Sequence, residues 1–316
     1  MYDVTALGEL LVDFAPVSID ADGYPTLAAK PGGAPANFLA ALAAYGAKTA
    51  LLCKVGTDAF GKLLIQTLKK AGIETAGIVE DSSVFTTLAF VTLDTTGNRS
   101  FSFARKPGAD ICLRFGELEL SLIDKARVFH FGTLSLTNEP ARDTTKRAAE
   151  YAKAAGKIIT FDPNLRCSLW DSLEEAKKQI LWGLELADVV KISDEEVEFL
   201  WDCSVQEGAR RLLEEYSIKL AMVTMGSEGA YIHNREASAY SPCPTVKPVD
   251  TTGAGDIFGG SAISRILKMR KPPEELTEEE LMSIASFATT AASLSTQRLG
   301  GISSIPSEDE INLVRK

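Results

Sequence analysis

Short runs of β-branched and aromatic residues alternate with amphipathic helical patterns along most of the chain, and this alternation restricts the fold more than any other feature. The clearest apolar runs are "TALLCKV" (49–55), "ARVFHFG" (126–132), "KIITFD" (157–162), "DVVKIS" (188–193) and "KLAMVTMG" (219–226). Continuous apolar strands separated by helices are typical of a parallel sheet that helices cover on both faces. The pattern therefore predicts an α/β fold with a mostly parallel central sheet. A length of 316 residues with 45% apolar side chains is ample for such a core.

Two segments, near residues 10–30 and 84–105, depart from the alternation of strands and helices, because they contain strand patterns without helices. The second segment has the pattern of a hairpin around the turn "DTTGN" at residues 94–98. Strands of this kind predict a small β-sheet lid over the carboxyl edge of the main sheet, where ligands bind in open α/β folds and lids exclude water. An antiparallel extension of the main sheet is the alternative. The absence of linkers and repeats predicts a single domain spanning residues 1–316.

Charge and cysteine content exclude several classes of protein. A net charge of -10 disfavours nucleic acid as a partner, although local groups can still hold a nucleotide. No apolar run approaches the roughly 20 residues that span a membrane, and the N-terminus has no signal-peptide pattern. The five cysteines never occur as C-x-x-C, which fits a reducing compartment and predicts a cytoplasmic protein.

The only two histidines, His130 and His233, lie in strand-like apolar runs and are predicted to be core or strand-face residues. A catalytic base in this chain is therefore more readily a carboxylate than an imidazole.

Residues 56–63, "GTDAFGKL", nearly match the phosphate-binding pattern G-x-x-x-x-G-K-[ST]. Leu63 replaces the hydroxyl that would bind magnesium, and Asp58 and Phe60 would place charge and bulk against a phosphate. We interpret this segment as an ordinary turn from a strand into a helix.

The stretch "VDTTGAGDIFGG" (249–260) places small residues and a carboxylate at the start of an apolar helical run. A helix start exposes unpaired N–H groups and the positive end of the helix dipole, so small residues there allow an anion to approach. An ordinary helix cap by Thr251 or Thr252, with Asp256 complementing the dipole, explains the same pattern.

A second glycine cluster, "KPGGAPANFLAALAAYG", begins at residue 30. Gly32 and Gly33 turn the chain, and Asn37 falls on the first turn of an alanine-rich helix. N–H groups beside an asparagine amide suit a neutral polyol, whereas a tight turn with close helix packing is the structural alternative.

The two glycine clusters, in this order, resemble the two signatures of the ribokinase-like (PfkB) carbohydrate kinases. The resemblance covers nearly the whole chain, including "VGTDAFG", "DPNLR", "KISDEE" and "VTMGSEGA", and "FSFARKPGAD" is most similar to the fructokinases. It implies a ribokinase-like three-layer fold with a β-sheet lid. It also implies an enzyme that transfers a phosphoryl group from ATP, with Mg²⁺, to a sugar.

The resemblance further implies roles for individual residues. Asp256 would be the general base, and the N–H groups of Ala254, Gly255 and Asp256, after the turn at Gly253, would form an anion hole for the transferred phosphoryl group. The implied substrate ligands are Asp13, Gly32, Gly33 and Asn37, with Arg105, reaching down from the lid, and Arg166 on the substrate and phosphate side.

The nucleotide and metal residues follow from the same resemblance. Lys191, Ser193 and Glu196 would lie at the nucleotide, with Glu196 organising Mg²⁺ through water, and Thr224, Gly226 and Gly229 resemble a nucleotide-binding turn. The family often has asparagine where this chain has Ser193, whose hydroxyl reaches less far. A K⁺ site would use the side chain of Asp250, the carbonyls of Thr252, Ser295, Arg298 and Gly300, and Ser304.

Fructose is the substrate that the resemblance favours, and fructose 6-phosphate would be the product. A 2-keto-3-deoxygluconate kinase is the nearest alternative, which Arg105 and Arg166 support and which Phe101 and Phe103 disfavour. A non-catalytic sugar or nucleotide sensor on the same fold is disfavoured, because a sensor has no need of a base at Asp256. A Rossmann dehydrogenase is disfavoured because the G-x-G-x-x-G that it needs between the first strand and helix is missing. The exposed face of the lid predicts a homodimer.

Overall fold

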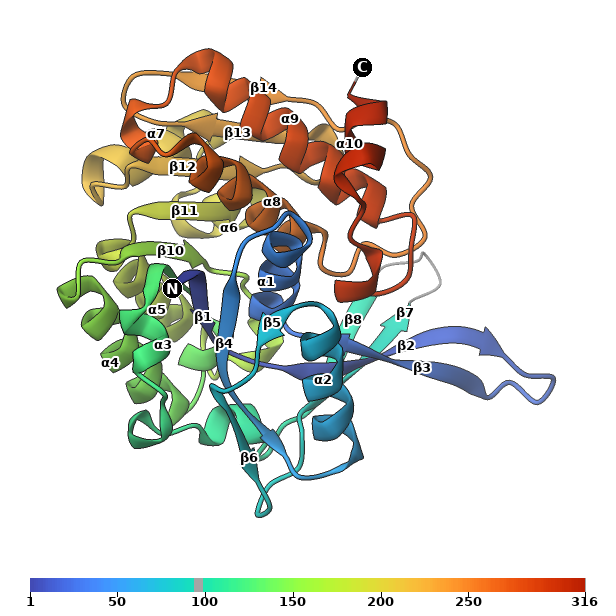
Figure 1. The fold of residues 1–316 in the computed structure, drawn as a ribbon. Helices are drawn as coiled ribbons and strands as arrows, with labels where there is room; N and C mark the ends of the chain where they lie inside the picture. The colour runs from blue at the N-terminus through green and yellow to red at the C-terminus, as the bar shows by residue number, and fades with distance from the viewer. Residues whose placement is uncertain (94–98, 316) are drawn as a thin grey trace.

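A ten-stranded central sheet organises the molecule (Figure 1), and a computed structural model describes residues 1–93 and 99–315 of the chain. The strands follow the order β14-β13-β12-β11-β10-β9-β1-β4-β5, and β6 pairs with β4 beside β5. All neighbouring strands from β12 to β5 are parallel, and only β13 and β14 pair antiparallel. The predicted mostly parallel sheet is confirmed.

The elements have the following bounds. The strands of the central sheet are β1 (Tyr2–Leu7), β4 (Thr49–Gly56), β5 (Ile73–Glu74), β6 (Ile78–Asp81), β9 (Ala126–Gly132), β10 (Ile158–Asp162), β11 (Val189–Ser193), β12 (Leu220–Thr224), β13 (Ala230–His233) and β14 (Ser238–Ser241). The helices are α1 (Ala34–Ala44), α2 (Ala59–Lys70), α3 (Ser121–Asp124), α4 (Ala141–Ala154), α5 (Leu173–Leu186), α6 (Asp194–Trp201), α7 (Val205–Glu215), α8 (Ala254–Met269), α9 (Glu278–Ser295) and α10 (Glu308–Val314).

Two apolar cores lie on opposite faces of the sheet. Helices α1, α2, α8 and α9 supply one core, and α3 to α7 supply the other. Successive residues of a strand alternate between the two, so Val128 of β9 packs in the first core and Phe129 in the second. This alternation explains why the strands read as continuous apolar runs, and it confirms the three-layer architecture.

A separate four-stranded sheet, here called the lid sheet, has the order β3-β2-β7-β8. It consists of β2 (Leu11–Ile19), β3 (Pro25–Gly32), β7 (Leu88–Leu93) and β8 (Arg99–Ala104). Because it is a sheet of its own, the alternative of an extension of the main sheet is wrong. The hairpin turn expected at residues 94–98 lies outside the described residues.

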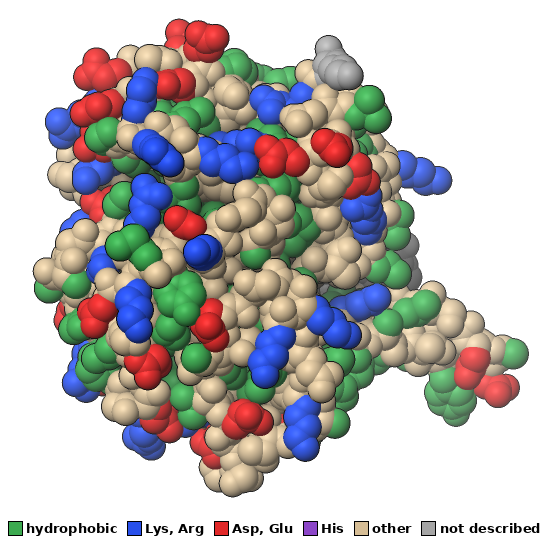
Figure 2. Space-filling view, in the orientation of Figure 1, with side chains coloured by type: hydrophobic (Ala, Val, Ile, Leu, Met, Phe, Trp, Pro, Cys, Tyr) green, Lys and Arg blue, Asp and Glu red, His purple; other side chains and the backbone are tan. Residues whose placement is uncertain are grey.

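The hairpin of β2 and β3, here called the arm, projects from the body of the molecule (Figure 1). Its outer part carries exposed apolar side chains, with Val17, Ile19 and Tyr24 exposed by 57%, 73% and 69%. Hydrophobic side chains gather on this arm in the space-filling view, with acidic ones toward its end (Figure 2).

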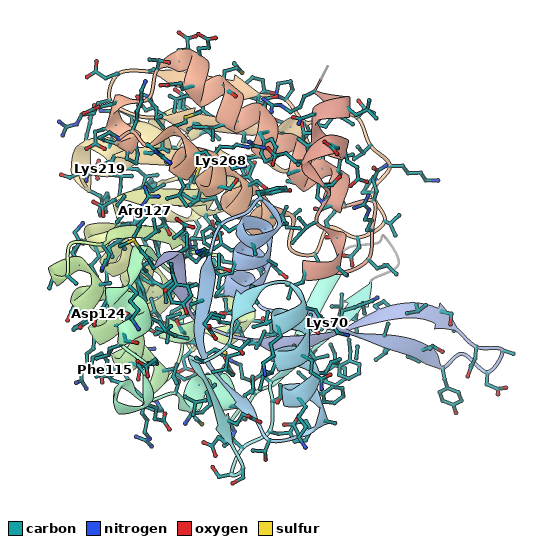
Figure 3. The ribbon with its side chains drawn as sticks, viewed as in Figure 1. Lys70, Phe115, Asp124, Arg127, Lys219 and Lys268 are labelled. Atoms are coloured by element: carbon teal, nitrogen blue, oxygen red, sulfur yellow. The ribbon has the colours of Figure 1, made fainter. Side chains whose placement is uncertain are left out.

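The parallel strands have a common direction, so their two ends form distinct edges. Figure 3 labels Arg127 and Lys219, which lie at the start of β9 and just before β12, on the amino edge. The lid sheet belongs to the carboxyl edge, because β2 follows β1 after three residues. No helix within residues 1–93 and 99–315 combines the length and the apolar character needed to cross a membrane.

Candidate active site

A cavity of about 260 Å³ lies where the carboxyl edge of the central sheet meets the lid sheet and the start of α8. Its walls come from segments far apart in the sequence. They are Glu9, Leu11, Asp13, Gly33, Ala34, Asn37, Phe103, Leu134, Asn164, Arg166, Lys191 and residues 251–256. Clefts at the carboxyl ends of strands in α/β sheets are the usual position of ligand sites.

The start of α8 forms one wall of this cavity. Gly253 is the N-cap residue, with φ of 76°, and no side chain caps the helix. The alternative in which Thr251 or Thr252 caps the helix is therefore wrong. Ala254 N–H donates to the Thr251 carbonyl at 3.3 Å, whereas no acceptor among the described residues contacts the N–H groups of Gly255 and Asp256. Gly255 and Asp256 lie in the first turn of α8 and line the cavity, at the positive end of the helix dipole. Their N–H groups can therefore bind an anion.

Asp256 and Asn37 join the two glycine clusters. Asn37 Nδ2 donates to Asp256 Oδ2 at 2.9 Å, and both side chains are buried. This contact depends on space at Gly253 and Gly301, because a Cβ at either glycine would collide with the Asn37 amide. The fold thus brings the predicted base and the predicted polyol ligand into direct contact.

Opposing effects determine the protonation of Asp256. Burial raises the pKa of its carboxyl above the usual range for aspartate. The hydrogen bond from Asn37 and the positive charges of Lys191 and Arg166 act in the opposite direction and favour the carboxylate. A carboxylate whose pKa is raised in this way accepts a proton more readily than an ordinary aspartate, which suits general-base catalysis.

Asp13 lies across the cavity on β2, next to Gly32 of the paired strand β3. A side chain at Gly32 would overlap the Asp13 carboxylate, so this glycine makes room for it. Burial raises the pKa of Asp13 to about 7, although the charge of Arg166 opposes the shift. Asp13 is therefore a buried acceptor that a polyol hydroxyl could satisfy.

Arg105 is not brought into the cavity. Its guanidinium pairs with Asp110 at 2.6 Å and donates to Thr137 Oγ1 at 2.8 Å and to the Leu134 carbonyl at 2.9 Å. These buried partners occupy the group and fix the loop that presents Leu134 to the cavity. Arg166, by contrast, lines the cavity as expected.

The predicted nucleotide residues cluster beside the cavity on the same sheet edge. Ser193 at the end of β11 is in register with Thr224 at the end of β12, and Gly226 and Gly229 follow in the next turn. Glu196 closes a capping box with Ser193 at the start of α6 and also accepts the Leu165 N–H at 2.7 Å. Both carboxylate oxygens of Glu196 therefore already accept N–H groups, and each keeps a further lone pair that could face a metal or a metal-bound water.

The segment after Val249 is tied to the loop that follows α9. Asp250 accepts the N–H of Thr252 at 2.9 Å and that of Gly300 at 2.8 Å, and the Thr296 carbonyl accepts the N–H groups of Val249 and Asp250. Of the expected cation ligands, Asp250, Thr252 and Gly300 are therefore in contact through these bonds. The expected role of Arg298 concerns its carbonyl, since its side chain pairs with Glu310. No cluster of three His, Cys, Asp or Glu side chains suited to a metal occurs among the described residues.

Sequence reasoning missed Glu9, Asn164 and Leu134. Glu9 is buried, and its Oε1 accepts the Ala34 N–H at 2.8 Å, so it caps α1 from the end of β1. Burial raises the pKa of Glu9 to about 7. An acidic residue between the apolar runs "TAL" and "LLV" was the available signal.

Two further predictions from sequence are confirmed. Asp58 caps α2 through the N–H groups of Phe60 and Gly61, so the near-match to a phosphate loop is a strand-to-helix turn. His130 is buried and stacks on Phe38 at 3.8 Å between ring centroids, and His233 lies on β13.

Residues 1–308 match the pfkB family of carbohydrate kinases. The chain belongs to the pfkB family of carbohydrate kinases. The expectation drawn from the two signatures is confirmed, and the dehydrogenase alternative is wrong. The chain is therefore a sugar kinase.

Relatives of known structure and name agree with this assignment. The kinase is 41% identical to fructokinase-1 of Zea mays over 311 residues, which is 98% of this chain and 96% of the maize protein. It is 30% identical to the Vibrio cholerae O395 fructokinase, with a TM-score of 0.89 over 100% of this chain and 99% of that one. That fructokinase was solved with fructose, ADP and calcium, and a double mutant of it with fructose, ADP and potassium.

A more distant neighbour carries a different name. A putative ribokinase II from E. coli, solved with ATP and Mg²⁺, is 28% identical, with a TM-score of 0.87 over 99% of both chains. The three-layer fold with its lid sheet is thus common to kinases with different sugar names.

Proposed function

We propose that this kinase transfers the γ-phosphoryl group of ATP to the 6-hydroxyl of D-fructose, giving fructose 6-phosphate and ADP. The observation that carries the proposal is the 2.9 Å contact of Asn37 with Asp256, beside two N–H groups at the start of α8 that have no acceptor within residues 1–93 and 99–315. Asp256 takes the hydroxyl proton, and the N–H groups of Gly255 and Asp256 stabilise charge on the transferred group. The fructokinase names of its relatives support fructose as the acceptor.

The sugar end of the cavity favours a neutral substrate over a sugar acid. Two acidic side chains, Glu9 and Asp13, line it, and Arg105 is committed to Asp110. A carboxylate-bearing substrate such as 2-keto-3-deoxygluconate would meet these acids with Arg166 as its nearest lining arginine. Phe103 lines the cavity from the lid sheet, whereas the side chain of Phe101 lies outside the described residues.

A coupled assay over fructose, glucose, ribose and 2-keto-3-deoxygluconate tests the proposal. Fructose should give the highest kcat/KM. A preference for 2-keto-3-deoxygluconate would overturn the assignment of fructose as the substrate but not the assignment of kinase activity. Binding of sugar and ATP without turnover of any substrate would favour the sensor.

The base is tested with Asp256→Asn, which should lower kcat by roughly 10²–10⁴-fold because the carboxylate is lost while the site keeps its shape. Asp309→Asn is a matched control, since Asp309 is an exposed acid in the first turn of α10. Near-native turnover in Asp256→Asn would exclude Asp256 as the base.

Bound ions complete the proposed site. Glu196 would hold Mg²⁺ through water beside Lys191 and Ser193, and Thr224, Gly226 and Gly229 would contact the nucleotide. The oxygen atoms around Asp250 and Ser304 suit a hard monovalent cation such as K⁺, with the carbonyls of Thr252, Ser295, Arg298 and Gly300 as further ligands. Omitting K⁺ should lower the thermal stability of the apo-protein as well as its turnover.

The assembly and compartment are also part of the proposal. The exposed apolar side chains Val17, Ile19 and Tyr24 on the arm support a homodimer through the lid sheet. Ile19→Asp should then shift the sedimentation coefficient to that of a monomer. The five cysteines are unpaired in the structure, which supports a reducing, cytoplasmic compartment.

A further inference from the structure

A second cavity, of about 280 Å³, lies at the amino edge of the central sheet, at the opposite edge from the active site. We call it the amino-edge cavity. The starts of β1 and β9, the turn after α1 and the end of α8 supply its walls. Its volume is close to the lower end of the range for ligand pockets, so it has room for a small molecule.

Three cationic side chains and one acid line the amino-edge cavity. They are Arg127 from β9, Lys268 and Arg270 from the end of α8, and Asp3 from β1. Figure 3 labels Arg127 and Lys268, and Lys and Arg side chains gather on this face in Figure 2. The chain has a net charge of -10, yet a local excess of cations attracts anions even on an acidic protein.

Neighbouring acids neutralise these cations only in part. Asp3 Oδ1 lies 3.6 Å from Arg127 Nη1, and Glu308 Oε2 lies 3.4 Å from Lys268 Nζ. Glu308 is also shared with Arg265. The side chains of Arg127 and Lys268 are exposed by 44% and 46%, so a ligand in the cavity can reach both.

Arg270 is the most informative of the three cations. It is the C-cap residue of α8 and has a left-handed backbone, with φ of 55°. This conformation favours glycine, because a Cβ is crowded there. Arg270 is exposed, and it has no acidic partner among the residues that the structure describes. Neither the turn nor an ion pair therefore accounts for an arginine at this position.

Helix dipoles offer a structural explanation for part of this cluster. Helices α1 and α8 both end at the amino-edge cavity, and cations near a helix C-terminus are stabilising. Lys268, in the last turn of α8, fits that role. Arg127 does not, because it belongs to a strand.

We propose that the amino-edge cavity binds a phosphate dianion, free or as a small phosphate monoester, through Arg127, Lys268 and Arg270. A dianion suits three cations that face one acid, and the forked donors of arginine match phosphate oxygens. No residue lines both this cavity and the active-site cavity, so the inference does not depend on the proposed function. A ligand that bridges the ends of α1 and α8 binds only the folded protein and should raise its unfolding temperature.

The probe is glycerol 3-phosphate, compared with inorganic phosphate and with glycerol. Its affinity is measured by titration calorimetry for the wild type, Arg127→Gln, Arg270→Gly, the double variant Arg127→Gln/Arg270→Gly, and Lys268→Gln. Lys70→Gln is the matched control for Lys268→Gln, since Lys70 (Figure 3) is an exposed lysine in the last turn of α2 that lines neither cavity. Arg166→Met tests binding in the active site, because Arg166 lines that cavity. The unfolding temperature of each variant is measured with and without the probe.

We expect each removed cation to weaken binding of glycerol 3-phosphate roughly fivefold, and the double variant to weaken it more than about tenfold, since these cations are partly exposed. Lys70→Gln should bind as the wild type does. Without ligand, Arg270→Gly should unfold at the temperature of the wild type or above it, because glycine suits the left-handed C-cap. Its weaker binding would then not result from misfolding.

Inorganic phosphate that binds as tightly as glycerol 3-phosphate would identify the free dianion as the ligand of this site, whereas glycerol should not bind. Equal affinity in the wild type and the double variant would overturn the proposal. So would a wild type that binds no probe at millimolar concentration. Binding lost only in Arg166→Met would place the ligand in the active site and overturn the proposal as well.

Discussion

Asn37 Nδ2 donates a 2.9 Å hydrogen bond to Asp256 Oδ2 across a sequence separation of 219 residues. The donor lies in the first turn of α1 and the acceptor in the first turn of α8, and these two helices pack against each other in one core. Because the bond favours the charged form of Asp256, Asn37 affects the proposed base as well as the proposed sugar site.

Asn37→Leu should move the acidic limb of the kcat profile to higher pH. The hydrogen bond lowers the pKa of Asp256 against the effect of burial, so losing the bond raises that pKa further. Since the carboxylate is the active form, turnover is then lost at a higher pH as the medium is acidified. The measurement is kcat at saturating fructose between pH 5.5 and 9, with the exposed helical residue variant Asn312→Leu as control. An unchanged limb would contradict this coupling.

Asp13→Asn should stabilise the protein at pH 8 while weakening sugar binding. Burial raises the pKa of Asp13 to about 7 in the folded state from a reference value of 3.8, so ionisation above this range costs folding free energy. The increase in the free energy of unfolding that Asp13→Asn gives is thus greatest above about pH 7, and it disappears as the pH falls toward 4.

The free energy of unfolding of Asp13→Asn is measured by urea denaturation at pH 8 and pH 5, alongside the fructose KM. Asp22→Asn, on the exposed tip of the same arm, controls for a general effect of removing an acid. A gain that is equal at both pH values would rule out the titration of Asp13 as its cause.

Arg105→Met should lower stability much more than it changes the fructose KM. It breaks a buried ion pair, and the uncompensated charge of Asp110 typically costs about 3–5 kcal/mol. The double variant Arg105→Met/Asp110→Leu should recover part of the unfolding free energy, whereas exposed Arg235→Met should have little effect. A large KM increase without loss of stability would restore Arg105 as a substrate ligand.

The lid sheet should close when fructose binds. Asp13 on β2 and Phe103 on β8 both line the cavity, so a sugar that touches them stabilises the closed arrangement. Hydrogen exchange with and without fructose should show added protection in β2 and β7, and less in the surface helix α7. Equal exchange in both states would mean that the lid sheet is a fixed wall.

The sequence predicts the central sheet well because strands that are buried on both faces must be continuous runs of apolar residues. The runs at 126–132 and 188–193 coincide with β9 and β11 to within one residue. The start of α8 was predicted as an anion site for the same kind of local reason, since only small residues leave N–H groups accessible there.

Contacts between distant residues were beyond such reasoning. Nothing near Arg105 shows that its guanidinium will bond to Thr137, 32 residues later, and not point into the cavity. Glu9 likewise caps a helix that begins 25 residues on, a pairing that the sheet topology creates. The sequence also could not show which residue begins α8. The N-cap residue is Gly253, with φ of 76°, whereas Thr251 and Thr252 were equally good candidates from their side chains.

The order of the strands has a consequence for biosynthesis. From β9 to β14 the strands lie side by side in the order in which a ribosome makes them, beginning next to β1. Each strand that leaves the exit tunnel can therefore join an edge formed by its predecessor, without threading between strands already paired. The nascent chain can build this half of the sheet outward one strand at a time, until the antiparallel pair β13 and β14 ends the growth.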